Sequence, residues 1–171
     1  MGKRSTFNRR ERDFYPTPYE AVVPLFPHLS SGYITFDEPC CGDGKLVGHI
    51  EGKGHICKSY SDIEPRVNYG KFINVFDKVK CQGDMFITNP PWDRKILHPL
   101  ITHLSRMAPT WLLFDADWMH TKQSADLIKY CLKIVSVGRV KWIPDSKMTG
   151  KDNCAWYLFG NDVVETTFFG R

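Results

Sequence analysis

The chain has 171 residues, of which 42% are hydrophobic and 25% are charged, and its formal net charge is +4. These values are typical of a globular protein and exclude a fibrous or largely disordered chain. The length suits one conventional core, so we expect residues 13–171 to form a single domain. No apolar run approaches the roughly 20 residues that span a bilayer, and the N-terminus lacks a secretory signal, which predicts a cytoplasmic protein without membrane partners.

Positive charge is concentrated at the N-terminus, where residues 1–12 form a polar, basic arm. Its basic residues are Lys3, Arg4, Arg9, Arg10 and Arg12. Such an arm is either a solvated surface or a contact for nucleic-acid phosphates. The six cysteines include no Cys-x-x-Cys pair, so we expect reduced thiols and no metal site.

Helix and strand signals alternate along the rest of the chain. A helix is expected over residues 17–29, where Thr17-Pro18 is a typical start and Pro24 and Pro27 keep the element short. Strands are predicted at residues 33–36, 56–61, 72–76, 85–88, 110–114, 134–142 and 154–159. Further helices are predicted at residues 45–51, 96–107 and 124–131. This alternation predicts an α/β fold, a three-layer sandwich around a mostly parallel sheet.

A glycine-rich loop follows the first predicted strand. Residues 37–44 read Asp-Glu-Pro-Cys-Cys-Gly-Asp-Gly. In an open α/β sheet, ligands bind at the carboxyl ends of the strands. Gly42 and Gly44 allow a tight bend and a close approach of the backbone to a ligand, although a single Gly-x-Gly also fits an ordinary turn.

An acidic residue ends the second predicted strand. Asp62 lies about 20 residues after the glycine-rich loop, a spacing suited to accepting hydrogen bonds from two ribose hydroxyls. Ile63 would then lie beside an adenine ring. A cap of a helix or turn is the alternative interpretation of Asp62.

The most informative motif is Thr-Asn-Pro-Pro-Trp at residues 88–92. Two consecutive prolines fix the backbone and remove two amide donors, so nearby carbonyls can face a ligand. The Asn89 side-chain oxygen and the Pro90 carbonyl could accept hydrogen bonds from an amine and orient its lone pair. Trp92 could stack on a base turned out of its helix, or it could be a core residue in a proline-rich loop.

These motifs, in this order, resemble the S-adenosylmethionine-dependent amino-group DNA methyltransferases of the N6-adenine type. Residues 38–44 are similar to the glycine loop of that family, and residues 13–18, Asp-Phe-Tyr-Pro-Thr-Pro, resemble its segment over the methionine end of the cofactor. The resemblance extends over roughly residues 13 to 160. It implies a Rossmann-like class I methyltransferase fold with S-adenosylmethionine as cofactor. The compact build also resembles the methyltransferases of phages and mobile elements, and a viral protein would act in the host cytoplasm.

The resemblance assigns roles to particular residues. The residues implied at the target amine are Asn89, Pro90, Pro91 and Trp92. Those implied at the cofactor are Tyr15, Thr17, Glu38, Pro39, Cys40, Gly42, Gly44, Asp62, Ile63 and Asp77. The residues predicted to bind nucleic acid are Arg9, Arg10, Arg12, Lys147 and Lys151. Trp156, in a segment similar to a late family motif, is either beside the target base or a core aromatic.

The chain has no room for the large target-recognition region that family members usually carry. Recognition is therefore minimal, shared with a partner, or built from a homodimer, and loops 93–97, 115–123 and 144–153 are candidates. We expect adenine in DNA as the substrate. The alternatives are adenine in RNA, glutamine in a protein, and a non-catalytic cofactor-binding subunit of a nucleic-acid-modifying complex, since fold alone does not separate them.

Overall fold

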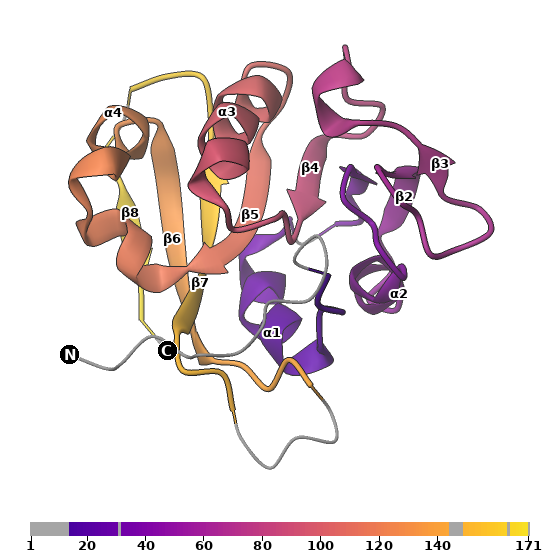
Figure 1. Cartoon of the computed structure of the whole chain (residues 1–171), viewed down its shortest axis with the longest axis horizontal. Helices are drawn as coiled ribbons and strands as arrows, with labels where there is room; N and C mark the ends of the chain where they lie inside the picture. Colours follow the sequence, from indigo (N-terminus) through magenta and orange to yellow (C-terminus); the bar gives the residue numbers. More distant parts are fainter. Residues whose placement is uncertain (1–13, 31, 144–148, 164, 171) are drawn as a thin grey trace.

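The computed structural model describes residues 14–30, 32–143, 149–163 and 165–170. Within these ranges, eight strands form a sheet in the order β3-β2-β1-β4-β5-β7-β6-β8. Neighbouring strands are parallel except where β7 pairs with β5 and β6. Figure 1 shows the sheet with helices on both sides. None of the helices in the described ranges is long and apolar enough to cross a membrane.

The strands are β1 Thr35–Glu38, β2 Ile56–Asp62, β3 Lys71–Phe72, β4 Met85–Thr88, β5 Thr110–Asp115, β6 Cys131–Arg139, β7 Asn153–Phe159 and β8 Thr167–Phe169. The α-helices are α1 Tyr19–Val22, α2 Lys45–Glu51, α3 Arg94–Ser105 and α4 Ala125–Ile128. Short 3₁₀ helices are η2 Val23–His28, η3 Val75–Asp77, η4 Ala116–His120 and η5 Lys122–Ser124.

Alternating side chains of the strands build one apolar core on each face of the sheet. On β5, Trp111 and Leu113 join the core beneath α1, η2 and α2, whereas Leu112 and Phe114 join the core beneath α3 and η4. This alternation follows from the two-residue period of a strand that is buried on both faces. The predicted three-layer α/β sandwich with a mostly parallel sheet is confirmed.

Several predicted elements differ from the structure. Residues 19–28 form a four-residue α-helix followed by a 3₁₀ helix, because Pro24 and Pro27 lack the N–H that a longer α-helix needs. The strand predicted at residues 72–76 is wrong over most of its length, since only Lys71–Phe72 pairs with β2 and Val75–Asp77 is helical. Cys131, which we expected to end a helix, begins β6. The strand β8 was not predicted.

The strand order brings the three motifs to one edge of the sheet. Strand β1 pairs in parallel with both β2 and β4, so the carboxyl ends of these three strands are neighbours. The glycine loop (residues 38–44) begins at the end of β1, Asp62 ends β2, and Asn89 follows β4. Residues separated by about fifty positions in sequence therefore surround one place, where ligands bind in open α/β sheets.

A buried ion pair fixes the segment before β4 to the sheet. The Lys78 amino group lies 3.3 Å from a carboxylate oxygen of Asp37 on β1 and donates to the Ser59 hydroxyl on β2 over 3.1 Å. The Asp37 carboxylate also accepts hydrogen bonds from the backbone N–H groups of Gln82 and Gly83. Asp37 is fully buried, so its charge depends on these partners.

We expect Lys78→Met to lower the free energy of unfolding by about 3–5 kcal/mol, because it leaves the Asp37 carboxylate buried without a counter-charge. Urea unfolding followed by circular dichroism would measure the loss. Lys80→Met, which changes an exposed lysine two residues away, serves as the control and should cost less than about 0.5 kcal/mol. Equal losses in the two variants would contradict this interpretation.

Candidate functional site

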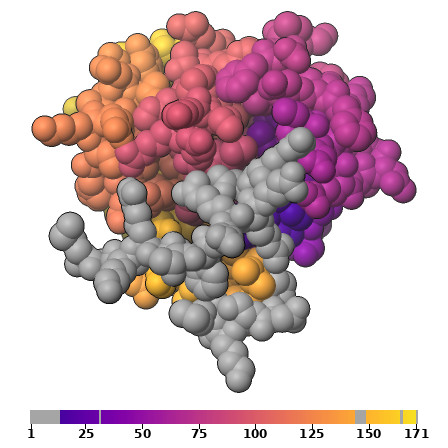
Figure 2. Space-filling model, in the orientation of Figure 1, coloured from indigo at the N-terminus to yellow at the C-terminus, as the bar shows by residue number. Residues whose placement is uncertain are grey.

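A cavity of about 700 Å³ lies at the edge of the sheet where the motifs meet. Its wall comes mainly from the N-terminal segment (residues 14–17), the glycine loop, the end of β2, residues 74–76, and the β4–α3 loop. The predicted site residues that line it are Tyr15, Thr17, Glu38, Pro39, Cys40, Gly42, Asp62, Ile63, Asn89 and Pro91. In the space-filling view, indigo surface of the N-terminal part borders the magenta surface of the region after β1 (Figure 2).

Four predicted residues do not line this cavity. Gly44 instead is the residue immediately before α2. It has a left-handed conformation with a φ of +76°, which favours glycine at this position. Asp77 lies outside, and residues 74–76 of the same segment line the wall in its place. Pro90 is buried next to the cavity, and Trp92 packs into both apolar cores.

The predicted nucleic-acid contacts are placed only in part. Arg9, Arg10, Arg12 and Lys147 lie outside the described residues, and Lys151 is exposed. Trp156 is fully buried, and its indole N–H donates to the Ala21 carbonyl over 2.8 Å. It is therefore a core residue, the second of the two interpretations that its sequence allowed.

Backbone contacts attach the glycine loop to the end of β2. One carboxylate oxygen of Asp62 accepts the Gly42 N–H over 2.9 Å, and the other accepts the Glu64 N–H over 2.8 Å. The Gly42 carbonyl in turn accepts the Arg66 N–H over 2.8 Å. Each Asp62 oxygen retains a lone pair for a ligand, because a carboxylate offers about four acceptor sites.

Phe14 packs against the glycine loop and accounts for the glycine at position 42. A Cβ at Gly42 would lie 2.8 Å from the Phe14 ring, so only glycine allows this close packing. The Arg66 guanidinium lies 4.0 Å from the centre of the same ring, within the range of a cation–π contact. Sequence reasoning missed Phe14, although it follows directly on Asp13 in the segment that we singled out.

Glu38 places a fully buried carboxyl group at the cavity. Burial raises its pKa to about 8, because the charged form is desolvated. One oxygen accepts the Cys40 N–H over 3.1 Å. The other oxygen is buried without a hydrogen-bond partner among the described residues. A positively charged ligand beside Glu38 would favour the ionised form and give this oxygen a partner.

Most of the other charged residues that the structure describes in the wall are also acidic. The acidic lining residues are Glu38, Asp43, Asp62, Glu64 and Asp93, and the basic lining residue is Arg66. A cavity with this excess of carboxylates attracts a cationic ligand. Exposed apolar surface lies beside Asp62, since Ile63 is 58% and Phe76 is 40% exposed. The residues therefore suit a ligand that combines a positive charge, a ribose and a flat ring.

Asn89 connects this cavity to the N-terminal segment and to β5. Its side-chain nitrogen donates to the Thr17 hydroxyl over 3.1 Å and to the Tyr15 carbonyl over 3.4 Å. Its side-chain oxygen accepts the Trp92 indole N–H over 3.3 Å, and that N–H also reaches the Leu113 carbonyl on β5 over 3.1 Å.

These partners determine which position of the Asn89 amide is the oxygen and which is the nitrogen. An indole N–H can only donate, so the Asn89 atom that faces Trp92 must be the oxygen. A carbonyl can only accept, so the Asn89 atom that faces the Tyr15 carbonyl must be the nitrogen. Both N–H groups of Asn89 are then used. The Asn89 oxygen and the Leu113 carbonyl share the single N–H of the Trp92 indole. The Asn89 oxygen can therefore accept a further hydrogen bond. Asn89 therefore lines the cavity with both of its donors engaged and with an oxygen that can accept a further hydrogen bond.

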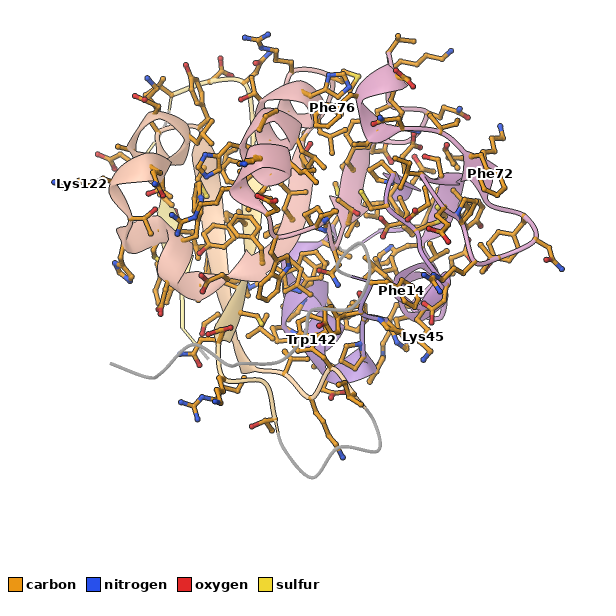
Figure 3. The ribbon with its side chains drawn as sticks, in the orientation of Figure 1. Phe14, Lys45, Phe72, Phe76, Lys122 and Trp142 are labelled. Carbon is orange, nitrogen blue, oxygen red and sulfur yellow. The ribbon has the colours of Figure 1, made fainter. Side chains whose placement is uncertain are left out.

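Trp142 is an aromatic residue of this region that sequence reasoning missed. Its ring lies 5.8 Å from the ring of Trp92 in an edge-to-face arrangement and 6.4 Å from that of Tyr15. Figure 3 shows Phe14 and Trp142 in the lower central part of the view, Phe72 at the edge near β3, and Phe76 at the top beside α3. We placed residue 142 at the end of a strand, but β6 ends at Arg139 and Trp142 is in the following loop.

No family model and no curated protein matches the sequence. Solved structures match by shape. One belongs to a type I restriction-modification system, with 14% identity and a TM-score of 0.61 over 95% of this chain and 46% of that chain. Another, from Listeria monocytogenes, is assigned to the class I S-adenosylmethionine-dependent methyltransferases, with 10% identity and a TM-score of 0.60 over 96% of this chain and 68% of that chain.

A third similar structure is a dimethyladenosine transferase from Plasmodium falciparum. It has 17% identity and a TM-score of 0.55, over 87% of this chain and 63% of that chain. The present chain thus spans less than two thirds of this protein and about half of the restriction-modification chain. At these identities the likeness establishes the fold, which is the Rossmann-like fold of class I methyltransferases.

Glu38→Gln should stabilise the protein relative to the wild type increasingly as the pH rises from about 5 to about 8. The folded state holds the Glu38 proton up to a pKa of about 8, whereas the ordinary value is 4.5. Between these values the unfolded chain binds fewer protons, so the wild-type free energy of unfolding falls with rising pH. The glutamine side chain of the variant has no proton to lose in this range.

Urea unfolding of the two proteins across this pH range measures the difference. Glu20→Gln, at an exposed acid on α1, is the matched control and should follow the wild type. A constant difference between Glu38→Gln and the wild type at every pH would show that the Glu38 pKa is not raised.

Proposed function

We propose that this protein is an S-adenosylmethionine-dependent methyltransferase that methylates the exocyclic amine of adenine in DNA. The observation that carries the proposal is the orientation of Asn89, whose side-chain oxygen remains able to accept while both of its N–H groups are engaged. An acceptor held in the wall of a cofactor-sized cavity is what an amine nucleophile requires.

The cavity residues fit S-adenosylmethionine. Asp62 would accept hydrogen bonds from the ribose hydroxyls, Ile63 and Phe76 would flank the adenine ring, and the Glu38 carboxyl would lie on the side of the positive charge. Asp77, which does not line the cavity, has no part in this assignment. When bound, the cofactor supplies a methyl group attached to a positively charged sulfur, and such a group needs no metal or further activation.

The protein's own contribution is positioning. Asn89 accepts an N–H of the target and turns the lone pair of that nitrogen toward the cavity, with the Pro90 carbonyl as the second acceptor. A ligand that presents only a carbonyl oxygen would face the Asn89 oxygen without a hydrogen bond, which is unfavourable in a partly dry site. Asn89 does not act as a base, because the nitrogen can release its proton to water after it is methylated.

We assign the two tryptophans different tasks. Trp92 holds the Asn89 oxygen in place with its indole N–H, and its ring is half-buried between the two cores. Trp142 is also half-buried but packs against only one of the cores, and it provides a surface on which a flipped base can stack. This division changes the expectation that Trp92 alone stacks on the base.

We prefer adenine in DNA as the substrate because the set of motifs and their order resemble the N6-adenine DNA type. The similarity in fold to a restriction-modification chain and to a dimethyladenosine transferase agrees with a nucleic-acid amine. Adenine in RNA and glutamine in a protein also present amine or amide N–H groups, so they are the direct competitors in the assay.

The proposal is tested by incubating the protein with methyl-labelled S-adenosylmethionine and, separately, single-stranded DNA, duplex DNA, RNA and protein extract. We expect label in DNA, recovered as N6-methyladenine after digestion to nucleosides. Label in RNA or on glutamine would show that the proposed substrate is wrong, although the protein would still be a methyltransferase. No transfer to any substrate, alone or with host extract as a source of partners, would favour the non-catalytic subunit.

Asn89→Ala should lower turnover by about 10²-fold or more, because it removes the acceptor that orients the target nitrogen. Cofactor affinity should stay within about twofold, since the residues assigned to the ribose and ring are untouched. Single-turnover kinetics and calorimetric titration with S-adenosylmethionine measure the two quantities. Loss of cofactor affinity with turnover unchanged at saturation would move Asn89 out of the target site.

A further inference from the structure

We infer that Thr17 is a positioning residue for the methyl acceptor, acting through Asn89, and is not primarily a cofactor ligand as its sequence context suggests. The inference rests on the proposed function for its catalytic consequence, but the contact itself can be measured without activity. The Thr17 hydroxyl accepts one of the two Asn89 N–H groups over 3.1 Å.

Thr17 is held from both sides. It is 5% exposed, and its backbone carbonyl lies 3.2 Å from a ring nitrogen of His49 near the end of α2. Pro18 follows it and favours an extended backbone at Thr17. Its hydroxyl is therefore presented to Asn89 by a segment with little freedom to move, and the contact joins positions 72 residues apart in sequence.

Removal of the hydroxyl would leave the Asn89 amide poorly restrained. The remaining partner of its nitrogen is the Tyr15 carbonyl at 3.4 Å, a longer and weaker hydrogen bond than the one to Thr17 at 3.1 Å. Trp92 restrains the oxygen alone, and its single N–H is shared with Leu113. An amide with one unpaired N–H gains by turning that group toward the cavity, where it would oppose the N–H of the target.

The same segment also contacts the cofactor side of the cavity. Phe14 packs against Gly42 of the glycine loop, and Thr17, three residues later, contacts Asn89. The backbone between them lines the cavity through Tyr15 and Pro16. Thr17 thus has two distinguishable roles open to it, binding the cofactor or orienting Asn89, and the Asn89 contact assigns it to the second.

The test compares Thr17→Val, which removes the hydroxyl at nearly constant shape, with Thr17→Ser, which keeps it. We expect Thr17→Val to lower the single-turnover rate at saturating cofactor by about tenfold, the scale of one hydrogen bond, and Thr17→Ser to restore most of it. Cofactor affinity by calorimetry should stay within about twofold in both. In an Asn89→Ala background, Thr17→Val should have no further effect on the rate.

A readout independent of activity is the Asn89 side-chain NH₂ in a ¹⁵N-correlated NMR spectrum, assigned by its disappearance in Asn89→Ala. In the wild type and Thr17→Ser, the two protons should differ in shift and exchange slowly with water. In Thr17→Val they should exchange faster. This NMR measurement can be made even if no methyl acceptor is found. It therefore distinguishes failure of this inference from failure of the proposed function.

Two results would overturn the inference. One is weaker cofactor binding by Thr17→Val with an unchanged rate at saturation, which would make Thr17 a cofactor ligand. The other is an Asn89 NH₂ signal that is the same in Thr17→Val as in the wild type. If Thr17→Val does not fold, Thr17→Ala carries the same comparisons.

Discussion

An amide side chain has a donor end and an acceptor end of nearly the same shape, and the chemistry at this site depends on which end faces the ligand. In this protein two partners that cannot change roles decide the matter, the Trp92 indole N–H and the Tyr15 carbonyl. Each comes from a different part of the fold. Trp92 is supported by β5 through Leu113, and Tyr15 belongs to the segment that crosses the cavity. The sheet, the N-terminal segment and the proline motif together define the polarity of one side chain.

The rest of the cavity follows from strand order and charge. Since β1 lies between β2 and β4, the glycine loop, Asp62 and Asn89 must share an edge. The charged residues that the structure describes in the wall are mainly acidic, and the buried Glu38 carboxyl has a raised pKa that a cation would lower again. In the proposed function, the cationic methyl donor and the neutral amine acceptor occupy adjacent parts of one site, with Glu38 and Asp62 on the donor side and Asn89 on the acceptor side.

The fold class and ten of the residues that line the cavity could be predicted from the sequence, because glycine, proline and a strand-end acid have local conformational meaning. What could not be predicted depends on tertiary contacts. Trp92 is half-buried because it packs into both apolar cores, and Trp142 approaches it from the loop after β6, where the sequence pattern predicted the end of a strand. Asp77 was misplaced because the segment after β3 is a short 3₁₀ helix, so residues 74–76 face the cavity. The Thr17–Asn89 contact joins positions 72 residues apart and leaves no local signal.

The central claim, that the Asn89 oxygen receives the N–H of the target amine, is tested most directly by a crystal structure of the protein with S-adenosylhomocysteine and an adenine-containing oligonucleotide. The account predicts the adenine amino nitrogen within hydrogen-bond distance of Oδ1 of Asn89, while Nδ2 of Asn89 still contacts Thr17 and Tyr15. A complex in which the Asn89 amide is reversed, or in which the bound base lies away from Asn89, would contradict it.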